Sequence, residues 1–138
     1  MTTLVDTNIL LDIATNDIKW ADWSLQQLDA ATVRGAVLIN AVIYAEFSVS
    51  YIRVEDLDKV LADVGLELVD IPRAALFLAG KVFQRYRARG GSRTGVLPDF
   101  FIGAHAAASE IPLLTRDPQR YRSYFSGITL IAPDKIAN

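Results

Sequence analysis

The sequence of 138 residues predicts an α/β fold in which helices flank a central, mainly parallel sheet of about five short strands. Short apolar runs alternate with longer segments of helical periodicity, which is the pattern of repeated strand–helix–strand units. Turn-forming or capping residues border the apolar runs, as expected at strand ends. A chain of this length typically forms one domain, so we assign residues 1–138 to a single domain.

Five short apolar runs are the predicted strands. The first leads directly into Asp6 and the second into Asn40, both of which can begin a turn or a helix. Apolar runs of this length, bounded by turn signals, are typical of buried strands. The predicted strands cover residues 3–5, 37–39, 66–71, 112–115 and 129–131.

The segments between the strands carry apolar side chains at helical spacing. The predicted helices fall near residues 20–33, 42–52, 57–64, 74–86 and 98–110. The apolar pattern of the first includes Leu25 and Val33, and that of the second includes Ile52. Pro98 suits the first turn of the last helix, where its missing N–H leaves no helical bond unmade. The glycine-rich stretch 90–95 is predicted to be a loop.

Composition excludes several classes of protein. Hydrophobic residues make up 51% of the chain and charged residues 22%, which does not fit a disordered tail. The absence of cysteine excludes a disulfide scaffold, a thiolate zinc site and a cysteine nucleophile. No apolar run approaches the ~18 residues of a membrane span, and the N-terminus lacks the basic region of a signal peptide. We therefore expect a cytoplasmic protein with no membrane partner.

The formal net charge of −2 hides an uneven distribution. Residues 1–80 carry five basic and twelve acidic side chains, whereas residues 81–138 carry nine basic and four acidic ones. A basic half can indicate a polyanionic partner such as nucleic acid. Folding can equally interleave the two halves, so charge alone leaves the partner open.

Four acidic residues stand where functional groups are often found in α/β proteins. Asp6 ends a strand, and Asp117 follows one. Asp99 falls in the first turn of a helix, and Glu46 interrupts an apolar helical pattern. Ligands bind beyond the carboxyl ends of the strands in open α/β sheets. Taken alone, each acid can instead be a helix cap, a favourable charge on a helix dipole, an exposed helical acid or a turn former. Their joint placement favours a functional role.

Carboxylates that converge need neutralisation, because like charges repel and buried charge is costly. Carboxylate oxygens are hard ligands that suit Mg²⁺, with Mn²⁺ as a substitute, whereas Zn²⁺ prefers nitrogen or sulfur. Two divalent ions balance four carboxylates and suit in-line displacement at a phosphodiester. If the four acids meet, the expected chemistry is hydrolysis of a phosphodiester by metal-activated water.

Four blocks of sequence, in order along nearly the whole chain, resemble the PIN-domain family. The blocks are Leu-Val-Asp-Thr-Asn-Ile-Leu-Leu-Asp at 4–12, Ala-Glu-Phe at 45–47, Leu-Pro-Asp-Phe-Phe-Ile-Gly-Ala-His-Ala at 97–106 and Leu-Leu-Thr-Arg-Asp-Pro at 113–118. Within the family, the chain is most similar to the VapC-type toxins of bacterial toxin–antitoxin pairs. The resemblance implies a PIN-like nuclease domain over residues 1–138 that acts as a Mg²⁺-dependent endoribonuclease. It also implies a small cognate antitoxin and a homodimer.

The resemblance also suggests a role for individual residues. The family's catalytic, metal-binding carboxylates correspond to Asp6, Glu46, Asp99 and Asp117. We expect the first and third of these to be the central ligands. The polar support residues correspond to Thr7, Asn8 and Thr115. Candidates for binding RNA phosphates are the arginines near the glycine-rich loop and near the last acid: Arg89, Arg93 and Arg116.

Other functions stay open at this point. A phosphatase or phosphotransferase would use Asp6 as nucleophile, but such sites usually have a second acid two residues later, where this chain has Asn8. They also need a lysine, for which Lys81 is available. A catalytically silent PIN-like module would bind RNA or a partner protein without cleaving. The residues themselves do not distinguish RNA from DNA.

Several aromatic residues and the single histidine allow more than one role. Trp20 and Trp23 either pack in the core or contribute to an apolar groove for the antitoxin. Three aromatic residues near the C-terminus either stack on unpaired bases or, as we favour, pack the last helix onto the sheet: Tyr121, Tyr124 and Phe125. His105 lies six positions after Asp99, which turns it away from that acid on a helix and favours packing or capping.

Overall fold

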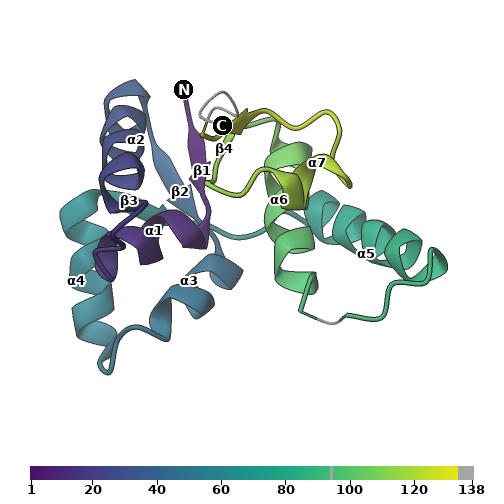
Figure 1. Cartoon of the computed structure of the whole chain (residues 1–138), viewed down its shortest axis with the longest axis horizontal. Coiled ribbons are helices and arrows are strands. Elements are labelled where there is room, and N and C mark those ends of the chain that lie inside the picture. The colour runs from purple at the N-terminus through teal and green to yellow at the C-terminus, as the bar shows by residue number, and fades with distance from the viewer. Residues whose placement is uncertain (94, 134–138) are drawn as a thin grey trace.

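The computed structural model describes residues 1–93 and 95–133, and at its centre lies a five-stranded parallel sheet (Figure 1). Its order is β3-β2-β1-β4-β5, and every neighbouring pair is parallel. The strands are β1 (Thr3–Val5), β2 (Val37–Ile39), β3 (Leu66–Leu68), β4 (Leu113–Leu114) and β5 (Leu130–Ile131). The predicted α/β class with about five short strands is confirmed.

Helices connect successive strands and cover both faces of the sheet. They are α1 (Thr7–Ala14), α2 (Ala21–Arg34), α3 (Ala41–Ser48), α4 (Val54–Val64), α5 (Arg73–Ala88), α6 (Leu97–Ser109) and α7 (Gln119–Arg122). In Figure 1, α2 and α4 lie on one side of the strands, and α5 and α6 lie on the other. Within the described part of the chain, no helix has both the length and the apolar character needed to cross a membrane.

The predicted helices correspond to α2 through α6, with two corrections to their apolar patterns. Ile52 lies beyond the end of α3 and is fully exposed, so it belongs to neither the helix nor the core. Leu25 and Val33 lie on α2 but are 46% and 86% exposed. Regular spacing of apolar residues did not distinguish the side of α2 that faces the sheet from the side that faces solvent.

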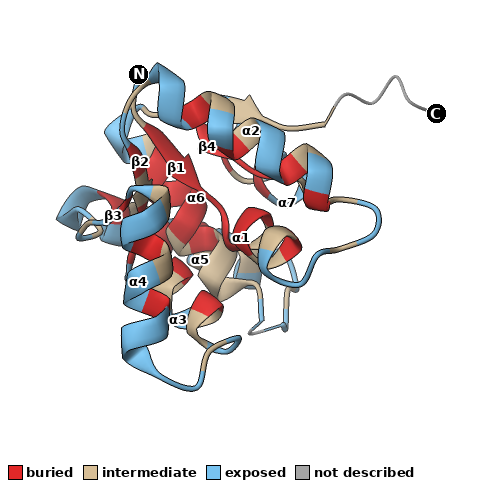
Figure 2. Ribbon diagram, turned by 90° about the vertical axis from the view of Figure 1, so that its left-hand side faces the viewer, coloured by how far each residue is buried: buried red, intermediate tan, exposed pale blue. Residues whose placement is uncertain are grey.

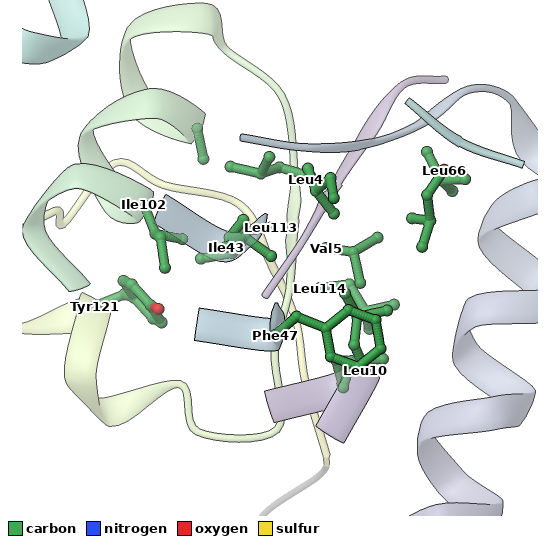
Figure 3. Close-up of a cluster of buried hydrophobic side chains, with 14 of the residues drawn as sticks. Leu4, Val5, Leu10, Ile43, Phe47, Leu66, Ile102, Leu113, Leu114 and Tyr121 are labelled. Carbon is green, nitrogen blue, oxygen red and sulfur yellow. The ribbon is translucent and has the colours of Figure 1, made fainter. Parts of the chain in front are cut away.

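The core consists of apolar side chains on the two faces of the central strands. Leu4, Val5, Leu113 and Leu114 are completely buried, because helices cover β1 and β4 on both faces. Figure 2 shows these strands buried while the outer sides of the helices are exposed. In Figure 3, Ile102 and Tyr121 lie to the left of these strand residues, and Phe47 and Leu10 lie below Val5 and Leu114.

The strand order places a crevice beside the end of β1. The chain passes from β1 to β2 on one side, whereas β4 joins β1 on the other, so the order of the strands reverses between β1 and β4. Such a switch point is where ligands bind in open α/β sheets. Asp6 follows β1 and Thr115 follows β4, and the backbone N–H of Asp6 bonds to the carbonyl of Leu114 at 2.9 Å.

Capping residues fix the helices that leave this edge. The Asp6 carboxylate accepts a bond from the Thr7 N–H and caps α1, while the Asn40 side chain accepts from the Ile43 N–H and caps α3. The Asn40 amide also contacts Nδ1 of the buried His105 on α6, at 3.0 Å. Burial lowers the pKa of His105. The expected packing role of His105 is confirmed, and the contact joins α6 to the start of α3.

Candidate functional site

A pocket of about 570 Å³ lies at the carboxyl edge of the sheet, next to β1. Its lining combines three of the four predicted acids with two arginines and a few small or apolar side chains. The residues are Asp6, Thr7, Asn8, Leu11, Glu46, Val49, Ser50, Asp99, Arg116 and Arg120. Segments from α1, α3, α6 and the region after β4 therefore meet at one place.

Asp6 is the most enclosed acid of the pocket, with only 2% of its surface exposed. Its Oδ2 atom accepts hydrogen bonds from the Tyr121 hydroxyl at 2.7 Å, the Thr115 hydroxyl at 2.8 Å and the Asn8 amide at 3.3 Å. Burial raises the pKa of Asp6, and the bonds from Tyr121, Thr115 and the Thr7 backbone partly offset this. Asp6 is thus both a helix cap and a buried, well-oriented carboxylate.

The three predicted support residues contact the acids or one another. The Thr7 hydroxyl donates to Oε1 of Glu46 at 2.6 Å, which joins the start of α1 to α3. The Asn8 amide also donates to the Thr115 hydroxyl at 3.1 Å. That hydroxyl accepts a further bond from the Asp117 N–H at 3.1 Å, so its lone pairs and its proton are all engaged.

Arg120 links the remaining two acids. Its guanidinium lies 2.8 Å from Oδ2 of Asp117 and 3.7 Å from Oδ1 of Asp99. Burial is the main cause that raises the pKa of Asp99 to about 6, and the charges of Asp6, Glu46 and Asp117 raise it further while Arg120 lowers it. Asp117 itself does not line the pocket. The four acids therefore share one electrostatic environment, with Asp117 at its periphery.

Among residues 1–93 and 95–133, no three aspartate, glutamate or histidine side chains are arranged ready to hold a metal ion. Arg120 occupies the space beside Asp99 and Asp117 and balances part of their charge. The donor set still fits a hard divalent cation, because all four acids are carboxylates, and burial together with their mutual repulsion raises the pKa of Asp99. His105 does not line the pocket, and its Nδ1 contacts the Asn40 amide.

Two of the three arginines proposed for RNA phosphates lie away from the pocket. Arg89 directly follows α5 as its C-cap, and Arg93 lies in the loop before α6, where its N–H donates to the Tyr86 hydroxyl at 3.0 Å. Neither lines the pocket. Arg116 does line it, and its Nε atom lies 2.7 Å from Oδ2 of Asp12.

A family model described as the PIN domain matches residues 3–125. The chain belongs to the PIN-domain family. No curated protein sequence matches it significantly.

Several solved structures superpose on this PIN domain. A chain of VapBC2 from Rickettsia felis, bound to a promoter DNA fragment, superposes with a TM-score of 0.73 and 20% identity over 97% of this chain and 100% of that chain. A chain of DNA-bound VapBC from Salmonella typhimurium superposes with a TM-score of 0.69 and 17% identity over 96% of this chain and 98% of that chain. A chain of a toxin–antitoxin complex from Klebsiella pneumoniae superposes with a TM-score of 0.66 and 22% identity over 96% of this chain and 98% of that chain. At these identities the likeness shows a shared fold.

Several contacts of this PIN domain were not predicted from sequence. Arg120 follows Asp117 by three residues, and that helical spacing is a signal that could have indicated the ion pair. The bond from Tyr121 to Asp6 and the pair of Arg116 with Asp12 span more than 100 residues, and no local pattern indicates them.

The aromatic residues take mainly structural positions in this PIN domain. Tyr121 and Phe125 are buried and pack near α6, which confirms packing over base stacking for these two. Tyr124 is half-buried and meets Phe100 edge to face with ring centroids 4.9 Å apart. Trp23 packs against the core, and Trp20 meets it edge to face at 5.9 Å.

Proposed function

We propose that this PIN domain is a Mg²⁺-dependent endoribonuclease and the toxin component of a type II toxin–antitoxin pair. The observation that carries the proposal is the convergence of Asp6, Glu46 and Asp99 on one pocket at the switch point of the sheet. Carboxylates that line one pocket offer the hard oxygen donors that a divalent cation prefers, and the family to which the chain belongs supports nuclease chemistry. We assign the whole chain, residues 1–138, to this one nuclease domain.

Asp6, Glu46 and Asp99 would hold the cation, with Asp117 completing the set once Arg120 moves aside. Mg²⁺ suits these oxygen ligands, and Mn²⁺ is the expected substitute. When bound, such a cation acts as a Lewis acid towards a phosphoryl oxygen and makes attack by water easier.

The chain's own residues prepare the site for that chemistry. Hydrogen bonds from Tyr121 and Thr115 fix the Asp6 carboxylate, and the Thr7 hydroxyl orients Glu46. Positioned arginines would bind the RNA strand through its phosphates, with Arg116 at the pocket and Arg89 and Arg93 along the path outside it. Each of these assignments can be tested by substitution.

Partners follow from the same proposal. The structural neighbours are VapBC and other toxin–antitoxin complexes, which supports a small cognate antitoxin for this chain as well. We propose that the toxin forms a homodimer and acts on RNA in the cytoplasm. Coexpression with the protein encoded by a small open reading frame next to this gene should relieve toxicity and yield a stable complex.

The alternative functions gain less support. A phosphotransferase that uses Asp6 as nucleophile usually has a second acid two residues later, but this chain has Asn8 there, whose amide donates to Oδ2 of Asp6. Lys81 lies on the exposed side of α5 with its ammonium 5.0 Å from the Phe77 ring centroid. A catalytically silent RNA- or partner-binding module remains the alternative that experiment must separate.

The deciding experiment is cleavage of a defined RNA by the purified protein, with Mg²⁺ and with excess EDTA. Asp6→Asn or Asp99→Asn should abolish Mg²⁺-dependent cleavage while the protein stays folded. Asp29→Asn, which removes an exposed acid of α2, is the matched control and should cleave normally. Mapping the RNA ends would identify the target. Undiminished cleavage by clean Asp6→Asn or Asp99→Asn protein, or no cleavage by the wild type, would overturn the proposal.

A further inference from the structure

A buried carboxylate outside the four predicted acids lies close to the pocket. Asp12, on α1, is 2% exposed. Its Oδ2 accepts a bond from the Ser24 hydroxyl at 2.9 Å and lies 2.7 Å from Nε of Arg116. Burying a carboxylate is costly, and a buried ion pair generally adds little net stability over an apolar pair. This arrangement therefore calls for a reason other than stability, and its only charged contact in the described chain is Arg116.

Three separate contacts fix the side chain and backbone of Arg116. Asp12 holds Nε, and the guanidinium carbon lies 5.8 Å from the ring centroid of Trp20, a cation–π distance. The Arg116 N–H bonds to Oδ1 of Asn8 at 3.3 Å, and Asn8 in turn contacts Asp6. A side chain held in this way loses little further conformational freedom when it binds a ligand.

Arg116 presents unused donors at the pocket. It lines the pocket with Asp6, Glu46 and Asp99, and its side chain is 31% exposed. Only its Nε is engaged within residues 1–93 and 95–133, which leaves its two Nη groups available. Arg120, the other cation of the lining, is instead held by Asp99 and Asp117. A planar guanidinium with both Nη groups available matches two oxygens of a phosphate.

We propose that Asp12 is a positioning residue that, with Trp20, holds the guanidinium of Arg116 to bind a backbone phosphate of the nucleic acid strand. This inference rests on the proposed function, because it takes the ligand to be RNA. It adds the pair Asp12 and Trp20 to the phosphate-binding machinery, although neither touches the strand.

The charge of Asp12 makes this proposal easy to separate from a general electrostatic effect. Removing an acid beside a polyanion strengthens binding if the acid acts only through its charge. Removing an acid that positions Arg116 weakens binding instead. Asp12→Asn should therefore change the affinity for RNA in the direction opposite to Asp29→Asn, which removes the same charge from an exposed part of α2.

The test is fluorescence anisotropy of a labelled single-stranded RNA in EDTA, so that binding is measured without cleavage. Arg116→Met keeps the apolar stem and should lower affinity about tenfold, with the salt slope smaller by roughly 0.7 for one lost phosphate contact. Asp12→Asn should lower affinity by roughly threefold to tenfold in wild type and by nothing further in Arg116→Met, because it acts through that side chain. Trp20→Leu should do the same to a smaller extent, and it covers the case in which Asp12→Asn does not fold.

The outcomes separate this inference from the proposed function. The inference alone would be overturned if the wild type binds and cleaves RNA but folded Asp12→Asn binds RNA as tightly as the wild type or more tightly. An equal loss of RNA affinity when Asp12→Asn is added to the wild type and to Arg116→Met would have the same meaning. Weaker binding by Asp12→Asn without any cleavage by wild type would support the inference and overturn the nuclease activity. A wild type that neither binds nor cleaves RNA would overturn both.

Discussion

The hydroxyl of Tyr121 donates a 2.7 Å hydrogen bond to Oδ2 of Asp6. Both groups are buried, and burial together with the charge of Asp6 raises the pKa of Tyr121 well above its ordinary value. The proton therefore stays on the phenol, and the bond favours the ionised form of Asp6. Residues of α7 thus control the protonation of a carboxylate at the end of β1.

Tyr121→Phe should remove this bond with little change in shape. The pKa of Asp6 should rise, so the acidic limb of the pH–rate profile for RNA cleavage should move to higher pH. Stability should fall by about 1–3 kcal/mol, the usual cost of losing a buried bond to a charged group. Urea unfolding and cleavage as a function of pH measure the two effects. Tyr124→Phe is the control, and equal behaviour of the two variants would contradict the assigned role of Tyr121.

Asp99→Asn should stabilise the metal-free protein at neutral pH. The pKa of Asp99 is raised to about 6 in the folded protein, above its ordinary value of 3.8, so the folded state holds this proton more tightly. The stabilisation from the proton bound to Asp99 is complete below about pH 4 and is lost as the pH rises through about 6. The variant should lose this part of the pH dependence and gain about 1–2 kcal/mol at pH 7, allowing for partial exposure. Thermal unfolding in EDTA between pH 4 and 8 tests this, and lower stability of the variant at pH 7 would contradict it.

Added Mg²⁺ should raise the unfolding temperature of the wild type, because a cation relieves the repulsion among the acids of the pocket. Binding at ten times the dissociation constant stabilises by about 1.4 kcal/mol. The gain should shrink below pH 6, where Asp99 takes up a proton. Glu46→Gln should reduce it, and Glu67→Gln, at an exposed position of β3, should not. A Mg²⁺ effect of equal size in both variants would place the cation elsewhere.

Gly103→Ala should disturb the packing that supports Tyr121. A Cβ at this position of α6 would lie 2.5 Å from the ring of Phe125 and 3.0 Å from that of Tyr121. We expect a loss of about 1–3 kcal/mol, the usual cost of overpacking a core. Gly80→Ala on α5 meets no atom within 4 Å and should instead stabilise by up to about 1 kcal/mol. Chemical denaturation of the two variants tests the contrast, which would be absent if α7 packed loosely on α6.

Local sequence patterns predicted the sheet well, because buried parallel strands are apolar on both faces and end at polar residues. The runs that end before Asp6 and Asn40 match β1 and β2 residue for residue. Helix α1 was not predicted as a separate element. A helix-capping role for Asp6 was considered only as an alternative to a functional role. The structure shows that the same carboxylate caps the helix and lines the pocket.

The site was harder to predict where it depends on contacts between distant segments. Asp6 and Asp117 were singled out because one ends a strand and the other follows one, and parallel strands end at the same edge, whereas Thr115 was identified only through the family resemblance. Asp12 carried no such signal, since its partner Arg116 lies 104 residues later. Arg120 did carry a local signal, because Asp117 lies three residues before it, but the ion pair between them was not predicted.

The bond between Asp6 and Tyr121 also has a consequence for protein synthesis. The ribosome makes Asp6 more than 100 residues before its hydroxyl partners Thr115 and Tyr121. While α7 is still inside the exit tunnel, the nascent chain lacks both donors as well as Arg116 and Arg120. The pocket is therefore complete only after α7 has left the exit tunnel.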